Sequence, residues 1–288
     1  MGGRVSSHPQ LRVGLIGAGR AGTVVARALE RVGHPCVAVD AISDAARSRA
    51  AQLLPSADVV DAVRVCALSD LIVIAVPDSA IATVVQGLVS ANAITDRHIV
   101  MHLSGAHGVS VLRPAAEAGA LTIAAHPAMT LHGRVEDVAR LQHCPFAVTA
   151  EGNALPIAQA LVIEMGGEPV VIAEQDRTLY HAALAHASNH AVSVIAQSME
   201  LLESIGVAQP GEYLRQLVNA SVEGALREGD RALTGPIARG DFATVRAHLE
   251  ALAEQRPSTR HAYVALAKAT VDRQQRMLDD ETAKALDQ

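Results

Sequence analysis

Short apolar runs alternate with segments of helical spacing along the first 173 residues. The apolar runs predict strands at 11–16, 36–39, 71–76, 98–103, 121–125, 146–149 and 169–172. Helical spacing predicts helices at 21–32, 43–54, 79–89 and 154–165, with one more between the strands at 98–103 and 121–125. Strands that alternate with helices form a parallel sheet with right-handed crossovers. The pattern therefore predicts an α/β domain with a doubly wound parallel sheet.

The pattern changes after Ala173. Residues 175–205 form one long helical pattern without an internal Gly or Pro, and Gly-Pro turns at 209–211 and 234–236 separate further helical segments. We therefore predict two domains, an α/β domain at 1–173 and an all-α domain at 174–288. A helix of this length cannot bury all its apolar residues on one small domain, which favours a homodimer formed through the helices.

Charge and composition limit the partners. The net charge is −6 without a basic run, which argues against nucleic acid, and no apolar run approaches the 18 residues of a membrane span. The first ten residues, MGGRVSSHPQ, predict a loose tail and not a signal peptide. Three cysteines are an odd number, typical of reduced thiols. These features predict a cytoplasmic protein.

A glycine-rich hexapeptide follows the first predicted strand and opens the first helix. Its residues are Gly17, Ala18, Gly19, Arg20, Ala21 and Gly22, in the pattern G-x-G-x-x-G. Such a loop brings the backbone close to a pyrophosphate, which then rests on the helix N-terminus. Asp40 ends the second strand, at the spacing of the acid that binds a ribose. Together these features predict a Rossmann-type dinucleotide site, with a ligand-free glycine turn as the alternative.

The acid at the second strand also bears on which dinucleotide binds. Asp40 would accept hydrogen bonds from ribose hydroxyls and repel a 2′-phosphate, which favours NAD over NADP. No Arg follows Asp40 directly, but Arg47 and Arg49 lie on the next helix and could reach a phosphate. NAD is therefore the expected cofactor and NADP the alternative; Asp40 acting only as a loop cap is the non-functional interpretation.

Several motifs together resemble one protein family. They are GAGRAGT from Gly17, AVPD at 75–78, HLSG at 102–105, AHPAMT at 125–130, HASNH at 186–190 and LTGPIARGD at 233–241. The chain resembles the actinobacterial-type group in which a Rossmann-like domain precedes domain of unknown function 2520. That group is similar in architecture to 6-phosphogluconate, hydroxyisobutyrate and prephenate dehydrogenases and to ketopantoate and pyrroline-carboxylate reductases. The resemblance implies an NAD(P)-dependent oxidoreductase whose C-terminal helices complete the site and usually form a dimer.

The sequence departs from those dehydrogenases at one catalytic position. Sugar-acid and hydroxyisobutyrate dehydrogenases carry K-x-x-x-N on the first long helix of the second domain. With the asparagine aligned on Asn189, Ala185 occupies the lysine position. His181 and His186 are possible replacements, and loss of catalysis is the alternative.

Candidate site residues lie where predicted strands end. Val76, Pro77 and Asp78 close a buried strand, where open α/β sheets bind ligands, although Pro77 and Asp78 could also only end a strand and cap a helix. Ser104 follows the next strand and His126 ends the one after. By similarity to prephenate dehydrogenases, Ser104 would bind substrate and His126 would exchange protons near its ordinary pKa of about 6.5. A purely structural histidine is the alternative.

The long helix supplies the remaining candidates. His186 and Asn189 are three residues apart and share a face, on which Asn189 could orient a carbonyl or hydroxyl group. His186 and His190 have metal-ligand spacing but lack partners, so no metal is expected. Arg239 is a weaker candidate for binding a substrate anion.

The sequence thus favours an NAD(P)-dependent oxidoreductase that acts on a small, anionic hydroxy or keto compound. Its candidate catalytic residues are Ser104, His126, His186 and Asn189. The alternative is a non-catalytic dinucleotide-binding sensor or regulatory protein, favoured by the missing lysine.

Overall fold

The chain divides into two units after Ala185. The structure, a computed structural model, describes residues 10–286, and its units are Met1–Ala185 and His186–Gln288. The predicted N-terminal tail lies, up to Pro9, outside the described residues. No helix among the described residues combines the length and apolar character needed to cross a bilayer.

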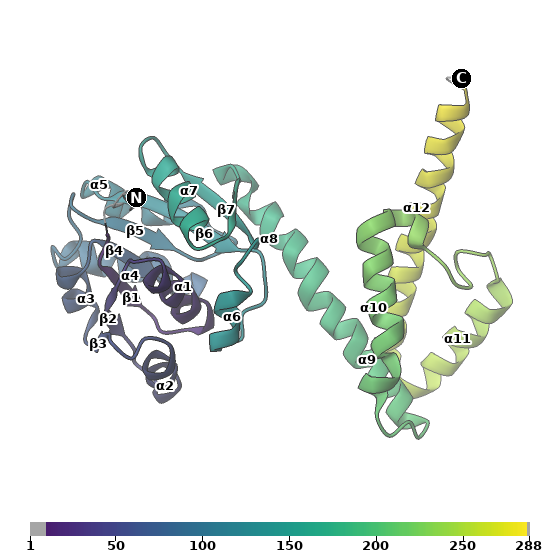
Figure 1. Cartoon of the computed structure of the whole chain (residues 1–288). Helices are drawn as coiled ribbons and strands as arrows, with labels where there is room; N and C mark the ends of the chain where they lie inside the picture. The colour runs from purple at the N-terminus through teal and green to yellow at the C-terminus, as the bar shows by residue number, and fades with distance from the viewer. Residues whose placement is uncertain (1–9, 287–288) are drawn as a thin grey trace, which may run out of the picture. The chain divides into compact units, whose positions relative to one another are not determined.

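The first unit contains one eight-stranded sheet (Figure 1). In space its strands run in the order β3-β2-β1-β4-β5-β6-β7-β8. Their bounds are β1 Val13–Ile16, β2 Cys36–Asp40, β3 Asp58–Val59, β4 Leu71–Ile74, β5 Ile99–His102, β6 Leu121–Pro127, β7 Pro145–Ala150 and β8 Glu168–Val171. The chain reverses its direction of growth along the sheet between β3 and β4, which places the switch point beside β1. The predicted doubly wound sheet is confirmed.

Helices cover both faces of the sheet because alternate strand residues point to opposite sides. In β4, Leu71 and Val73 belong to one apolar core, whereas Ile72 and Ile74 belong to the other. The helices of the first core are α1 Arg20–Arg31, α2 Asp44–Leu53, α6 Val135–Ala139 and α7 Ala154–Glu164. Those of the second are α3 Ala62–Leu68, α4 Asp78–Ser90 and α5 Arg113–Glu117, which follows the 3₁₀ turn η1 Val109–Leu112.

Two features of the sheet differ from the predicted pattern. Strand β7 runs antiparallel to β6, whereas all other neighbours are parallel. The only helix between β6 and β7 is α6, of five residues, too short to carry the chain back across the sheet as a parallel crossover requires. The short elements β3 and α3 were also not predicted, because two exposed strand residues and a seven-residue helix leave little periodicity.

The long helical pattern predicted for 175–205 is helical in the structure but not uniform. It comprises the 3₁₀ turn η2 Glu174–Asp176, α8 Arg177–Ala185, the π-helical turn η3 His186–His190 and α9 Ala191–Ser204. The boundary between the two units falls at the start of the π turn, between Ala185 and His186.

The second unit is all helical and has almost no core of its own. After α9 it contains α10 Pro210–Glu228, the 3₁₀ turn η4 Gly229–Ala232, α11 Phe242–Gln255 and α12 Pro257–Leu286. Among its described side chains only Pro210, Leu252 and Thr259 are buried. Large apolar side chains, such as Leu226 and Phe242, are mostly exposed.

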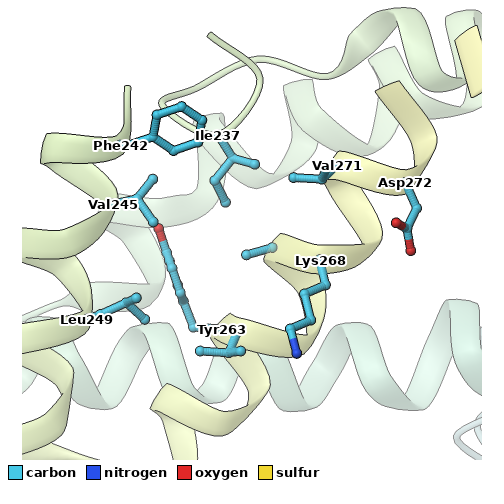
Figure 2. Close-up of a pocket in the computed structure, with 10 residues that line it drawn as sticks. Ile237, Phe242, Val245, Leu249, Tyr263, Lys268, Val271 and Asp272 are labelled. Atoms are coloured by element: carbon cyan, nitrogen blue, oxygen red, sulfur yellow. The ribbon is translucent and has the colours of Figure 1, made fainter. Parts of the chain in front are cut away.

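An apolar groove lies between α11, α12 and the turn that precedes α11 (Figure 2). Its volume is about 370 Å³. Phe242, Val245 and Leu249 line it from α11, and Tyr263 and Val271 line it from α12. Polar groups are few, with Lys268 and Asp272 on the α12 side.

Candidate active site

The glycines of the loop between β1 and α1 have different structural roles. Gly17 has φ +90°, and a Cβ there would lie 2.8 Å from the Ala75 carbonyl oxygen. A Cβ at Gly22 would lie 2.5 Å from the Ala75 side chain. At Gly19 the nearest atom is 3.5 Å away, an ordinary contact. The fold therefore requires Gly17 and Gly22, whereas Gly19 leaves open space at the N-terminus of α1.

A cleft of about 330 Å³ opens beside this loop. The glycine loop, the end of β4 and the segment after β5 line it together, through Gly19, Arg20, Ala21, Gly22, Ile74, Ala75, Val76, Pro77, Asp78, Leu103 and Ser104. Within the described residues, α1 has neither a side-chain cap nor an acidic residue in its first turn. Its N-terminal amides and Arg20 thus favour an anion, and the bare Gly19 gives room for a pyrophosphate.

Asp40 ends β2 next to the glycine loop, and its backbone carbonyl accepts a hydrogen bond from Gly17 N (3.1 Å). Its carboxylate has no hydrogen-bond partner among the described residues. Burial and the Asp61 carboxylate raise the pKa of Asp40. Two arginines lie close by: Arg47 Nε donates to Ala41 O, and Arg49 Nε donates to Ala18 O, each at 3.1 Å. The expected preference for NAD stays a prediction, and these arginines are the groups that would reverse it.

Ser104 is held in a tight turn after β5. Its Oγ accepts hydrogen bonds from Ala106 N (3.2 Å) and His107 N (3.3 Å), so its own proton stays available for donation. The nearby His102 is buried and uses both ring nitrogens on the backbone: Nδ1 accepts from Ser104 N and Nε2 donates to Gly108 O. Burial lowers the pKa of His102 to about 4, so it is neutral and shapes the turn.

Arg177, the first residue of α8, is buried against the same edge of the sheet. Its guanidinium donates to the carbonyls of Ser104 (3.4 Å), Ala124 (3.0 Å) and Ala147 (3.1 Å), and to Thr149 Oγ1 (2.8 Å). Ala124 pairs with His102, the last residue of β5. The start of α8 is thereby fixed to β6, β7 and the turn after β5. No carboxylate among the described residues forms a salt bridge with this buried cation.

His126, near the end of β6, lies between two side chains of α8. Its Nδ1 is 2.9 Å from the Tyr180 hydroxyl, and its ring meets the His181 ring edge to face at 6.3 Å between centroids. A Cβ built on Gly105 would lie 3.1 Å from His126 Nε2, so the residue after Ser104 is next to this nitrogen. The structure thus brings His126, Tyr180 and His181 next to the Ser104 turn.

The expectation that His126 titrates near pH 6.5 is wrong. Burial, together with the neighbouring His181 and Arg177, lowers the pKa of His126 to about 4. Desolvation disfavours the charged imidazolium, and Arg177 is a fixed positive charge. His126 is therefore a neutral imidazole at pH 7, with one donor and one acceptor nitrogen.

His186 and Asn189 belong to the π-helical turn of the second unit, and both are exposed. His186 Nδ1 lies 2.8 Å from His190 Nδ1, and the Asn189 carbonyl accepts from Ser193 Oγ at 3.1 Å. Single π turns occur frequently at functional sites. Among the described residues, no three His, Cys, Asp or Glu side chains form a metal-ligand group. The approach of His186 and Asn189 to the cleft stays a prediction.

Arg239 is exposed, in the turn before α11. Asp241 caps that helix, because its carboxylate accepts from Thr244 N at 3.1 Å. A substrate contact by Arg239 stays a prediction.

Sequence reasoning missed Arg177 and Tyr180 as site residues and considered His181 only as a replacement for lysine. All three lie in the first two turns of α8. Their signal was present: a run of Arg, Tyr and His where a helix follows the last strand of the sheet. This run did not indicate a site, because neither spacing nor the resemblance assigns a role to those positions.

The doubly wound sheet, with a glycine loop beside a cleft at the carboxyl ends of β1, β4 and β5, defines the class of Rossmann-like α/β folds. Two family models match the sequence: a Rossmann-like domain over residues 4–127 and the domain of unknown function 2520 over residues 144–270. The chain therefore carries both domains, in the order that the motifs predicted. A comparison with curated proteins found no match.

Several solved structures share this fold. A protein from Bacteroides fragilis, provisionally assigned as an NADP oxidoreductase, is 22% identical with a TM-score of 0.77, over 91% of this chain and 98% of that one. An imine reductase from Pseudomonas sp. is 20% identical with a TM-score of 0.64, over 90% and 93%. The pyrroline carboxylate reductase of Plasmodium falciparum, solved with NADP bound, is 12% identical with a TM-score of 0.58, over 92% and 99%.

Proposed function

We propose that the protein is an NAD(P)-dependent oxidoreductase that transfers a hydride to or from a small hydroxy or keto compound. The observation that carries this proposal is the shared cleft: the glycine loop, the Val76–Asp78 segment and Ser104 line one cavity. A dinucleotide bound along the loop would lead toward Ser104, with His126 beside the adjoining Gly105. The similar structures named as reductases support the same class of reaction.

Each residue has a definite task in this proposal. Gly17 to Gly22 hold the pyrophosphate, Asp40 binds the adenosine ribose, and the backbone from Val76 to Asp78 contacts the second ribose. Ser104 donates a hydrogen bond to the substrate, and His126 binds its reacting oxygen or nitrogen. His186 and Asn189, in the second unit, are the further candidate groups for orienting a substrate carbonyl or hydroxyl. The cofactor supplies the hydride; the protein binds, orients and excludes water.

The charge of the site favours an anionic substrate. Arg177 is a buried cation whose hydrogen-bond partners are three carbonyls and one hydroxyl. The Glu174 carboxylate attracts it electrostatically but binds the backbone amides of Val109 and Ser110 without forming a salt bridge to it. Charges interact more strongly in a poorly solvated site than in water. A substrate carboxylate, or the negative charge that develops on a reduced carbonyl oxygen, would be stabilised there.

We also propose a homodimer in which a second copy covers the helical unit. Only three described side chains of that unit are buried, which is too small a core for about 100 residues to be stable alone. Obligate dimers place such a core between the subunits.

A non-catalytic sensor is the competing function, and it rests on Ala185 at the lysine position. Turnover separates the two. The purified protein is mixed with NADH or NADPH and a panel of keto acids and cyclic imines, and cofactor oxidation is followed by absorbance. We expect oxidation with at least one anionic compound. Binding of the cofactor without turnover of any compound would favour the sensor.

The catalytic site is tested by comparing two histidine variants. His126→Asn should lower kcat by roughly 100-fold, the scale of losing a positioned proton-transfer or polarising group, with little change in cofactor affinity. His143→Asn is the matched control, because His143 is exposed and Asn tolerates its positive φ of 59°. Equal activity of the two variants would contradict the proposed site.

A further inference from the structure

His126 and Tyr180 form a hydrogen-bonded pair that nothing in the cofactor site requires. The Tyr180 hydroxyl lies 2.9 Å from His126 Nδ1, and the rings meet edge to face at 5.7 Å and 83°. The two residues come from different elements, His126 from β6 and Tyr180 from α8. The hydrogen bonds of Arg177 to β6 and β7 hold the start of α8 in place, so the pair rests on a fixed support.

The direction of this hydrogen bond follows from the partners available. Tyr180 is half-buried, and burial raises its pKa, so the phenol keeps its proton at neutral pH. Its only hydrogen-bond partner among the described residues is His126. If Nδ1 carried a proton, the phenol proton would lack a protein acceptor. Donation from Tyr180 to Nδ1 satisfies both groups and leaves the imidazole proton on Nε2.

The Nε2 atom lies on the side of the Ser104 turn. A Cβ on Gly105 would sit 3.1 Å from Nε2 and 2.8 Å from His181 Cδ2, which would cover the nitrogen. With glycine there, no side chain of residue 105 lies against Nε2, which is next to the Ser104 turn. Burial is the main cause that disfavours protonation of the ring; the nearby titratable groups His181, Arg177 and His102 add to it, and Asp78 opposes it. Their sum keeps His126 neutral, so it does not gain a second donor at pH 7.

We propose that Tyr180 is a positioning residue that locks His126 as an Nε2–H donor, so that the site binds and polarises a carbonyl or imine group. This inference rests on the proposed function and specifies its substrate class. A carbonyl oxygen or imine nitrogen offers a lone pair to such a donor, and a neutral imidazole can polarise it. Hydride from the cofactor would reach the carbonyl or imine carbon while Nε2–H gives its proton to the oxygen or nitrogen. Nδ1 would take the Tyr180 hydroxyl proton in the same step, solvent would then restore it, and oxidation would follow the same path in reverse.

The tautomer is measured directly by nitrogen NMR of the full chain labelled with ¹⁵N-histidine. Protonated and unprotonated ring nitrogens differ strongly in chemical shift, and His126→Asn identifies the signals of His126. We expect a protonated Nε2 and an unprotonated, hydrogen-bonded Nδ1 at pH 7. In Tyr180→Phe the Nδ1 shift should change and both tautomers should appear. Tyr213→Phe, which removes the same hydroxyl from an exposed position on α10, should leave the His126 signals unchanged.

Kinetics provide the second measurement. Tyr180→Phe should lower kcat for reduction by about 10-fold, the scale of one hydrogen bond, with KM for the cofactor unchanged. A protonated Nδ1 in the wild-type protein, or His126 signals that Tyr180→Phe does not alter, would overturn the inference even if the enzyme is active. A locked tautomer in a protein without turnover would support the positioning role and count against the proposed function instead.

Discussion

At the residue scale, two glycines of the same motif are needed for different reasons, one for packing and one, in the proposed function, for ligand binding. Gly22 packs its Cα against Ala75, so the protein itself excludes a side chain there. Gly19 has room for a Cβ, so only a bound ligand would exclude one. A sequence motif treats the two positions alike, whereas the structure separates a packing requirement from a binding requirement.

We predict that Gly19→Val abolishes dinucleotide binding while the protein stays folded. The branched side chain fills the space proposed for the pyrophosphate, and a β-branched residue at the N-cap costs about 1 kcal/mol of stability. Gly22→Val should instead destabilise the fold by about 3 kcal/mol or more, because overpacking against Ala75 adds strain. Fluorescence titration with each reduced cofactor and urea unfolding measure the two effects.

The same titration of the wild-type protein tests cofactor preference. We expect tighter binding of NADH, because Asp40 ends β2 beside the glycine loop and its carboxylate forms no salt bridge within the described part of the chain. Tighter binding of NADPH would show that Arg47 and Arg49 outweigh Asp40. Normal binding by Gly19→Val would contradict the placement of the cofactor in this cleft.

At the element scale, Arg177 joins the last helix of the first unit to the sheet. Its hydrogen bonds reach β6, β7 and the turn after β5, so one side chain fixes the part of α8 that carries Tyr180 and His181. An arginine is suited to this role because its planar group has five donors and stays charged when buried.

We predict that Arg177→Met lowers the free energy of unfolding of the first unit by about 3 kcal/mol or more, since it leaves several buried acceptors short of a donor. Arg113→Met is the control, because Arg113 forms only an exposed pair with Glu117 and should change stability by less than about 0.5 kcal/mol. Urea unfolding followed by circular dichroism measures both variants. Similar midpoints for the two would show that Arg177 does not hold α8 to the sheet.

The parts of the fold that follow local patterns were predictable from the sequence. The run 71–76 is apolar at every position because both faces of β4 are covered, and the glycine motif has a strong local requirement at Gly17. The antiparallel direction of β7 was not predictable from the sequence, because it depends on how far the short α6 carries the chain. The lowered pKa of His126 was not predictable either. It results from burial and from the charge of Arg177, and both depend on how α8 packs against β6.

At the scale of the whole molecule, the two units differ in how many of their apolar residues they bury. The first buries apolar residues on both faces of its sheet. The helices of the second leave such residues exposed, including Leu217 and Leu226 on α10 and Phe242 at the groove of Figure 2. Exposed apolar surface of this extent is typical of an interface, which is why we assign a second copy to it.

We predict that the protein is a dimer at micromolar concentration, so light scattering should return twice the 30.0 kDa mass of the chain. Phe242→Glu places a charge in the apolar groove and should weaken the dimer at least 10-fold, because a carboxylate is costly to bury without a partner. Ile163→Glu is the matched control: Ile163 is 60% exposed on α7 of the first unit, so the same charge there should leave the mass unchanged. In the proposed dimer the second unit obtains its core from the partner, so Phe242→Glu should also lower the thermal stability of that unit in a concentration-dependent manner. A wild-type species of 30.0 kDa that unfolds independently of its concentration would rule out the dimer.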